Sequence, residues 1–146
     1  MNSLETKASS TFKAGLNCAQ AVLASYSEKL KFDEEMALRV SCGFGGGMGR
    51  MQDTCGVVTG AFMVLGIYNC QKYTDNKDRK DKTYKMVRDF NEKFLAIHHT
   101  TNCKSLLNCD LSTPEGQQKV KDQNLHEKIW MKQDRSFSII LVNLNK

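Results

Sequence analysis

Five glycines lie among the nine residues of the segment 42–50, CGFGGGMGR. Glycine loses more conformational freedom on folding than any other residue and readily adopts positive φ, so this segment does not form the interior of a stable helix or strand. We therefore expect a loop that turns the chain sharply between two helices. The sequence on either side of this loop has to supply the regular structure.

Apolar residues recur with helical spacing on both sides of the glycine segment. They predict one amphipathic helix over residues 12–30 and a shorter helix over residues 33–40, which has acidic residues in its first turn. After the glycines, Asp53 or Thr54 is suited to cap a helix over residues 55–68. The apolar residues of this helix lie all round it, which indicates a buried central helix.

The second half of the chain is more polar. Residues 71–81 read as a linker or helix end, residues 84–97 as an amphipathic helix and residues 103–108 as a short helix. Pro114 follows two good N-cap residues and predicts the start of a polar helix that runs toward Lys128.

The C-terminal segment differs in its apolar pattern from the polar segment before it. Residues 130–146 form an atypical C-terminal segment, in which the apolar run 139–142 fits either a short strand or a docked extended end. No internal repeat or domain linker is visible. We therefore predict one domain over residues 1–146, an all-α bundle of about five or six helices with a glycine-rich loop before the buried central helix.

Six cysteines in 146 residues are far fewer than a small disulfide-built scaffold contains. The N-terminal segment lacks the apolar core of a secretory signal, and no apolar run is long enough to cross a bilayer, so the expected location is the cytoplasm, without membrane insertion. Thiols stay reduced there, and a cysteine cluster then indicates metal binding or catalysis. The net charge of +5 comes from lysines interleaved with acids, and we expect no nucleic-acid partner.

The glycine segment matches neither nucleotide-binding loop by spacing, and no strand is predicted before it. The simplest interpretation is that its glycines let the chain turn and let backbones approach closely. An alternative places the segment as a wall beside Cys55, where N–H groups and a positive charge would contact a cofactor sulfur or a small anion. The candidate cofactor-contacting residues in the segment and in the following helix are Gly45, Gly46, Gly47, Arg50, Gly56 and Gly60.

Cys55 is the strongest candidate for chemistry. It falls in the predicted first turn of the central helix, where N–H groups and the helix dipole would stabilise a thiolate and lower its pKa. Gly56 and Gly60 lie on the adjacent helix face, so a second helix or a cofactor could come close to the backbone. The alternative is a buried, inert cysteine packed in an apolar helix.

The other cysteines are less distinctive. Cys18 lies at the edge of the apolar stripe of its helix, which favours either packing or a place in a site between helices. Cys103 and Cys109 are too far apart for a C-x-x-C centre, whereas His99 and Cys103 are spaced as a one-turn ligand pair. An exposed histidine pair, His98 and His99, near a helix end is nevertheless the favoured interpretation. Cys42 and Cys70 lie at opposite ends of the predicted central hairpin.

Four segments of the chain form a recognisable series: Gly15-Leu16-Asn17-Cys18-Ala19-Gln20-Ala21-Val22, Phe44-Gly45-Gly46-Gly47-Met48-Gly49-Arg50, Cys55-Gly56-Val57-Val58-Thr59-Gly60 and Asn102-Cys103-Lys104-Ser105-Leu106-Leu107. Taken together, they resemble the family of redox-active proteins named for a C…GCAxxG…C…C cysteine pattern. The resemblance covers residues from about 10 to 125. It implies a helical fold and a redox role.

By the same resemblance, Cys18 is the first family cysteine, Cys55 that of the glycine motif and Cys103 the third. Val57 stands where the family usually has alanine. A fourth family cysteine is expected near residues 129–131, where this chain has Ile-Trp-Met. Either three cysteines suffice, or Cys42 or Cys109 substitutes, or activity is lost.

Three functions follow as hypotheses. The first is a thiol redox protein with Cys55 as the nucleophile and Cys103 or Cys18 as its resolving partner, which implies a redox partner. The second is an iron–sulfur or zinc site on Cys18, Cys55 and Cys103, with His99 or another cysteine as the fourth ligand. The third is a non-catalytic interaction module, in which the glycine-lined helix face packs against a second copy of the chain.

Overall fold

The computed structural model describes residues 3–125, 139, 140 and 144, and helices make up almost all of the regular structure in this part of the chain. The predicted all-α class is confirmed. No helix among the described residues is long and apolar enough to cross a membrane. The elements are α1 (Ser3–Lys13), α2 (Cys18–Ser25), α3 (Ser27–Leu30), α4 (Glu34–Ser41), a 3₁₀ turn η1 (Cys42–Phe44), α5 (Gly45–Met48), α6 (Gly56–Lys72), α7 (Asn76–His98), α8 (Cys103–Leu107) and α9 (Pro114–Asp122).

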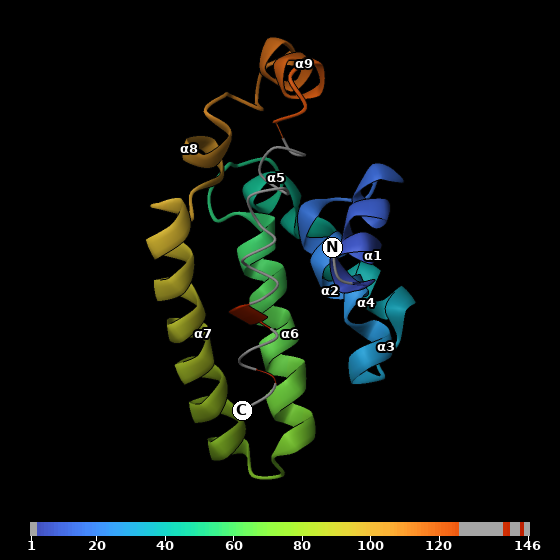
Figure 1. The fold of residues 1–146 in the computed structure, drawn as a ribbon, viewed down its shortest axis with the longest axis vertical. Coiled ribbons are helices and arrows are strands. Elements are labelled where there is room, and N and C mark those ends of the chain that lie inside the picture. The colour runs from blue at the N-terminus through green and yellow to red at the C-terminus, as the bar shows by residue number, and fades with distance from the viewer. Residues whose placement is uncertain (1–2, 126–138, 141–143, 145–146) are drawn as a thin grey trace.

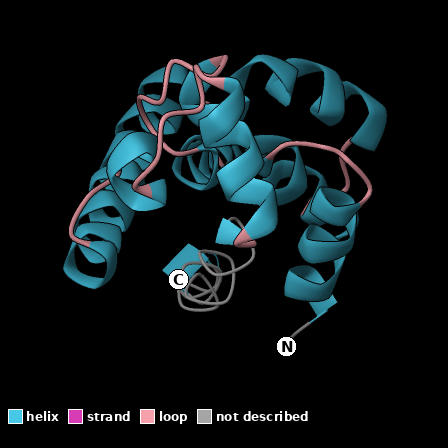
Figure 2. Ribbon diagram, turned by 90° about the horizontal axis from the view of Figure 1, so that it is seen from above, coloured by secondary structure: helices cyan, strands magenta, loops and turns pink. Residues whose placement is uncertain are grey.

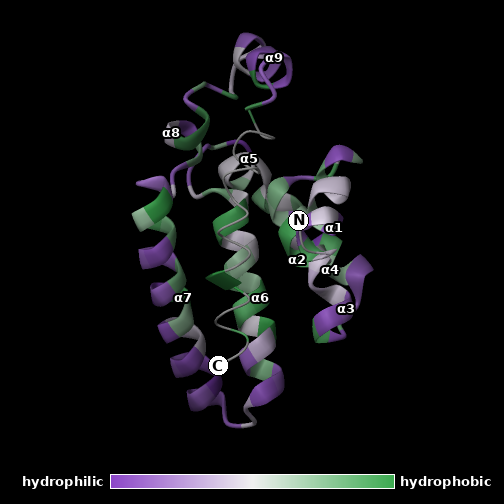
Figure 3. Ribbon diagram, viewed as in Figure 1, coloured by the Kyte–Doolittle hydropathy of each residue, from purple (hydrophilic) through white to green (hydrophobic). Residues whose placement is uncertain are grey.

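Helix α6 is the centre of the fold. It forms an antiparallel hairpin with α7 on one side and packs against α2 on the other, while α8 and α9 lie beyond its N-terminal end (Figures 1 and 2). Apolar residues extend along much of α6, whereas α7 is largely hydrophilic (Figure 3). Val57, Val64 and Leu65 of α6 are at most 1 % exposed, which confirms the predicted buried central helix.

The prediction of one helix over residues 12–30 is wrong. The chain leaves α1 after Lys13, turns at Gly15 with a φ of +98°, and starts α2 at Cys18. Asn17 and Gln20 form a capping box, in which each side chain accepts a hydrogen bond from the other residue's backbone N–H (3.0 and 2.9 Å). This local cap outweighs the continuous apolar spacing, and it moves Cys18 from a helix interior to a helix start.

The glycine segment 42–50 is not a plain loop. The short helical turns η1 and α5 occupy most of it, and within α5 both Gly46 (φ +64°) and Gly47 (φ +69°) leave the right-handed helical region. Glycine adopts such positive φ values without the steric cost that other residues meet. The result is a compact turn between α4 and α6, which we call the glycine turn.

Two helix starts differ from their predicted positions. Helix α6 begins at Gly56 with Cys55 as its N-cap, because residues 53–55 are extended and pair with residues 101–103. Helix α7 already begins at Asn76, where the Asp75 side chain accepts a hydrogen bond from the Asp78 N–H. Because α6 continues to Lys72, eight of the eleven residues 71–81, predicted as a linker or helix end, are helical. Helix α9 starts after its predicted cap, Thr113, and α4 starts within one residue of the predicted position, with Asp33 as its N-cap.

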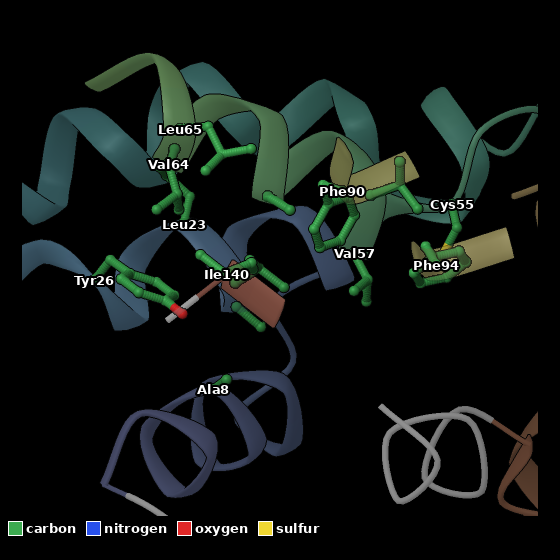
Figure 4. Packing of buried hydrophobic residues seen from close by; sticks show 14 of the residues in the cluster. Ala8, Leu23, Tyr26, Cys55, Val57, Val64, Leu65, Phe90, Phe94 and Ile140 are labelled. Carbon is green, nitrogen blue, oxygen red and sulfur yellow. The ribbon is translucent and has the colours of Figure 1, made fainter. Parts of the chain in front are cut away.

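For the C-terminal run 139–142, either a short strand or a docked extended end is predicted. The described residues of this segment do not form a strand. Residues 139, 140 and 144 are helical, and Ile140 is completely buried in the main core. Figure 4 shows Ile140 among the core side chains contributed by α2 and α6. The remaining residues of the segment 130–146, and the end of the polar helix predicted toward Lys128, lie outside the described residues.

Close packing between α2 and α6 depends on Gly60. A Cβ atom at this position would lie 2.9 Å from the Val22 Cβ and 3.0 Å from the Ala19 carbonyl oxygen. We expect Gly60→Ala to lower the free energy of unfolding by about 1–3 kcal/mol, because the helices must move apart. At Gly66, in the same helix, an added Cβ atom would have no neighbouring atom within 4 Å.

Gly66→Ala is therefore the matched control for Gly60→Ala. It should raise the free energy of unfolding by about 0.5–1 kcal/mol, since alanine loses less conformational freedom in a helix than glycine does. Urea unfolding of both variants measures the difference. Equal effects of the two substitutions would contradict the close approach of α2 and α6 at Gly60.

Candidate functional site

Three cysteines from distant parts of the sequence meet near the N-terminal end of α6. Cys18 is the first residue of α2, Cys55 is the N-cap of α6 and Cys103 is the first residue of α8. The ionisation of Cys18 is affected by both of the others, and that of Cys103 is affected by Cys55. We call these three residues the thiol cluster.

A short antiparallel pairing brings Cys55 and Cys103 together. The Cys55 N–H donates to the Thr101 carbonyl (2.8 Å), and the Cys103 N–H donates to the Asp53 carbonyl (2.6 Å), on either side of the bridge between Thr54 and Asn102. Side chains alternate across such a pairing, so Cys55 and Cys103 project to the same side as diagonal neighbours.

Cys18 reaches the cluster because Gly56 has no side chain. A Cβ atom on Gly56 would lie 2.8 Å from the Ala19 backbone nitrogen and 2.9 Å from the Cys18 Cβ. The first turn of α2 is therefore packed directly on the first turn of α6. Gly56 and Gly60 were predicted to admit either a helix or a cofactor, and the neighbour in the structure is helix α2.

Gly47, within the glycine turn, and Gln52, just after it, contact the Cys103 side of the thiol cluster. A Cβ atom on Gly47 would lie 2.5 Å from the Cys103 Cβ and 2.7 Å from the Gln52 Cα. The buried Gln52 side chain donates to the Cys109 carbonyl, accepts from the Leu111 N–H, both at 2.7 Å, and hydrogen-bonds the Cys103 thiol. No sequence pattern singles out Gln52, because its role depends on chain segments more than 50 residues away.

Burial raises the pKa of all three cluster thiols. For Cys55, loss of solvent outweighs hydrogen bonding by the Val57 and Val58 N–H groups, which acts to lower the pKa. The pKa of Cys103 is raised to about 12, first by burial and then by the charge of Cys55. For Cys18, burial and then the charges of Cys55 and Cys103 raise the pKa well above its usual value. The lowered pKa predicted for Cys55 is therefore wrong, since the desolvation cost exceeds the stabilisation at the helix start.

The remaining cysteines lie in different surroundings. Cys42 is exposed at the start of the glycine turn, and Cys70 is exposed near the other end of α6. Cys109 is half-buried, with its Sγ 3.6 Å from the Gly116 carbonyl oxygen, and its charge contributes to the raised pKa of Cys103. Cys109 is thus the extra cysteine with a connection to the cluster, whereas the position of the missing fourth family cysteine lies outside the described residues.

The geometry does not favour the predicted metal site. His99 is the exposed C-cap residue of α7, and His98 rather than His99 stacks on an aromatic ring, that of Phe94 (centroid distance 4.3 Å). Within residues 3–125 and the three described tail residues, no three histidine, cysteine or acidic side chains are placed to hold one metal ion. The donor set Cys18, Cys55, Cys103 and His99 is therefore not assembled in this structure.

A cavity of about 870 Å³ borders the cluster at Cys18. It lies between the turn that joins α1 to α2, the glycine turn and α9. Gly45, Gly46 and Arg50, three of the predicted cofactor-contacting residues, line it, whereas Gly47 is buried below the turn. Other lining residues are Phe12, Lys13, Leu16, Asn17, Cys18, Cys42, Leu111, Gln117, Val120, Lys121 and Asn124.

These features define a helical protein with a cluster of three thiols, two of them buried and the third, Cys18, at the edge of a cavity. Over residues 16–131 the chain matches the family described as "Putative redox-active protein (C_GCAxxG_C_C)", and it belongs to that family. No curated protein and no solved structure matched the chain.

Proposed function

We propose that this protein is a thiol–disulfide redox protein in which two cysteines of the thiol cluster interconvert between dithiol and disulfide. The observation that supports this function is that Cys18, Cys55 and Cys103, from three separate chain segments, lie together; the sequence resemblance assigns these three positions to the family cysteines. The expected reacting pair is Cys18 and Cys55, at the starts of two helices packed directly on each other. Cys103 is the third thiol, beside Cys55.

The surroundings of the cluster favour neutral sulfur species. A buried thiolate is costly, whereas a buried thiol or disulfide carries no charge. Oxidation of the pair by a small disulfide, RSSR, gives one protein disulfide and two RSH molecules, so the protein loses two hydrogens and the oxidant gains them. Because thiol–disulfide exchange proceeds through a thiolate, the reaction should accelerate as the pH rises toward the raised pKa values.

The proposal is tested with a protein in which Cys42, Cys70 and Cys109 are replaced by serine. This variant is reduced, treated with neutral 2-hydroxyethyl disulfide and mapped by mass spectrometry of non-reduced peptides. We expect one internal disulfide, between Cys18 and Cys55. With Cys55→Ser and Cys103→Ser added, the reaction should stop at a mixed disulfide on Cys18, because no other cluster thiol remains.

Controls separate the cluster from ordinary surface thiols. Cys70→Ser alone, in the otherwise native chain, should form the same internal disulfide, because Cys70 is exposed near the other end of α6. A link between Cys55 and Cys103 would keep the redox function and change the reacting pair. Failure to form any link within the cluster, or links only through Cys42, Cys70 or Cys109 in the native chain, would overturn the proposal.

Two further points belong with this function. A reducing compartment such as the cytoplasm suits a protein that works from the dithiol state, and we propose that location from the cysteine content. The glycine-lined face of α6, which the interaction-module hypothesis assigned to a second copy, packs against α2 of the same chain at Gly56 and Gly60. That hypothesis therefore loses its proposed surface.

A further inference from the structure

The cavity beside α2 gives a small molecule access to the thiol cluster at Cys18. Of the three cluster cysteines, Cys18 lines the cavity, while Cys55 and Cys103 are 7 % and 6 % exposed and do not. A volume of about 870 Å³ lies within the range of sites that hold small organic ligands. Size and position therefore point to a ligand that meets Cys18 first.

The charged residues of this cavity are of one sign. Lys13, Arg50 and Lys121 line it, and no aspartate or glutamate is among its described lining residues. Across the described part of the chain, neither Arg50 nor Lys121 forms an ion pair, although lysines elsewhere do. Arg50 and Lys121 lie on one concave surface and form no ion pair with a described residue, and cations placed in this way favour an anionic ligand.

The glycine turn places Arg50 at this cavity. A Cβ atom on Gly46 would lie 2.8 Å from the Arg50 Cγ, so the absence of a side chain at Gly46 makes room for the arginine stem. The Arg50 N–H donates to the Gly45 carbonyl (3.2 Å), which fixes the backbone at the same turn. The cavity also has apolar lining side chains, including Phe12, Leu111 and Val120, which suit the carbon skeleton of an organic molecule.

We propose that this cavity binds a low-molecular-weight disulfide carrying carboxylate or phosphate groups and presents its S–S bond to Cys18. This inference rests on the proposed redox function and adds the substrate class. The Cys18 sulfur, after losing its proton to solvent, attacks one sulfur of the bound disulfide. A bond forms between Cys18 and that sulfur, the S–S bond of the ligand breaks, and the second half leaves as a thiolate that takes up a proton.

The second step completes the exchange inside the protein. The Cys55 sulfur, after losing its proton, attacks the Cys18 sulfur of the mixed disulfide. A bond between Cys18 and Cys55 forms, and the remaining half of the ligand leaves as a thiolate and is protonated. The ligand is reduced to two thiols and the protein is oxidised by two electrons.

The test varies ligand charge while the reacting bond stays the same. In the variant Cys42→Ser/Cys55→Ser, the rate of mixed-disulfide formation at Cys18 is measured with glutathione disulfide, coenzyme A disulfide, neutral 2-hydroxyethyl disulfide and cationic cystamine. We expect the anionic disulfides to react about tenfold faster than the neutral one, with cystamine slowest, because the cavity is cationic. A faster reaction with glutathione disulfide indicates a preference for carboxylates, and a faster reaction with coenzyme A disulfide indicates a preference for phosphates.

Adding Arg50→Gln and Lys121→Gln should lower the ratio of anionic to neutral rates to near one. The matched control, Lys80→Gln with Lys85→Gln, removes two exposed lysines from α7 and should leave that ratio unchanged. A ratio near one in the unaltered cavity, or a ratio insensitive to Arg50 and Lys121, would overturn the substrate class while the redox function stands. If no disulfide of any charge reacts at Cys18, Cys18 is not the thiol that meets the ligand first, and the redox function then stands only if peptide mapping of the protein that retains Cys55 shows a link between Cys55 and Cys103.

Discussion

Gly47→Ala is expected to lower the free energy of unfolding by about 3 kcal/mol, the sum of a positive-φ penalty and forced movement of packed backbone. Gly47 has a φ of +69°, and an added Cβ would lie 2.5 Å from the Cys103 Cβ and 2.8 Å from the Asp53 backbone nitrogen. Neither neighbour is the flexible end of a side chain. Accommodating the methyl group therefore requires displacement of the paired segment that holds Cys103.

Gly49→Ala provides the control in the same turn. Gly49 also has a positive φ, +61°, but an added Cβ there would have only the Gly43 carbonyl oxygen nearby, at 3.8 Å. The alanine should cost only about 1–2 kcal/mol, the penalty of a left-handed conformation. The two variants are compared by urea unfolding and by the alkylation rate of Cys103, which should rise only in Gly47→Ala. Equal destabilisation by the two substitutions would show that Cys103 is not packed closely against Gly47.

The reduced protein should lose stability as the pH rises above about 9. The unfolded thiols titrate near 9.0, whereas the folded Cys103 thiol has a pKa of about 12 and those of Cys18 and Cys55 are also raised. Between these values the folded state binds more protons than the unfolded state, so raising the pH favours unfolding. The stabilisation is complete below pH 9 and declines by up to about 1.4 kcal/mol per pH unit for each such thiol.

Urea unfolding under reducing conditions at pH 8, 9 and 10 measures this decline. Tyrosines and lysines also titrate in this range, so the informative quantity is the difference between variants. Cys103→Ser should show a shallower decline than the native chain, whereas Cys70→Ser, which removes an exposed thiol, should match it. Identical slopes for Cys103→Ser and the native chain would mean that the Cys103 thiol titrates alike in the folded and unfolded states.

The parts of the fold that are well predicted from sequence are those set by residues close together in the chain. The uniform apolar character of residues 55–68 predicts a buried central helix, and the polar caps Asp33 and Thr113 mark the starts of α4 and α9. The break between α1 and α2 is not predicted, although Gly15 and the capping box of Asn17 and Gln20 are visible in the sequence. Apolar residues continue with helical spacing across that break, and this spacing by itself favours one continuous helix.

The sequence predicts which cysteines belong to the site but not how they are arranged in space. The family resemblance identifies Cys18, Cys55 and Cys103. The prediction of a lowered pKa for Cys55 considers only its place at a helix start and leaves out its burial. Burial depends on which segments cover a residue, and the covering segment around Cys103 is fixed by long-range backbone pairing. The supporting role of Gln52 and the cavity beside Cys18 depend on the same long-range contacts, which no local pattern encodes.

The pairing of residues 53–55 with residues 101–103 also determines how early the thiol cluster can form while the chain is being synthesised. Cys18 and Cys55 belong to helices that can be made early, but residues 101–103, which pair with residues 53–55, exist only after about two-thirds of these 146 residues have been synthesised. Because N-terminal parts of a chain fold first during synthesis, the complete cluster is a late product of folding. A nascent or truncated chain therefore holds cysteines without the enclosed site, and competence for exchange would mark the finished protein.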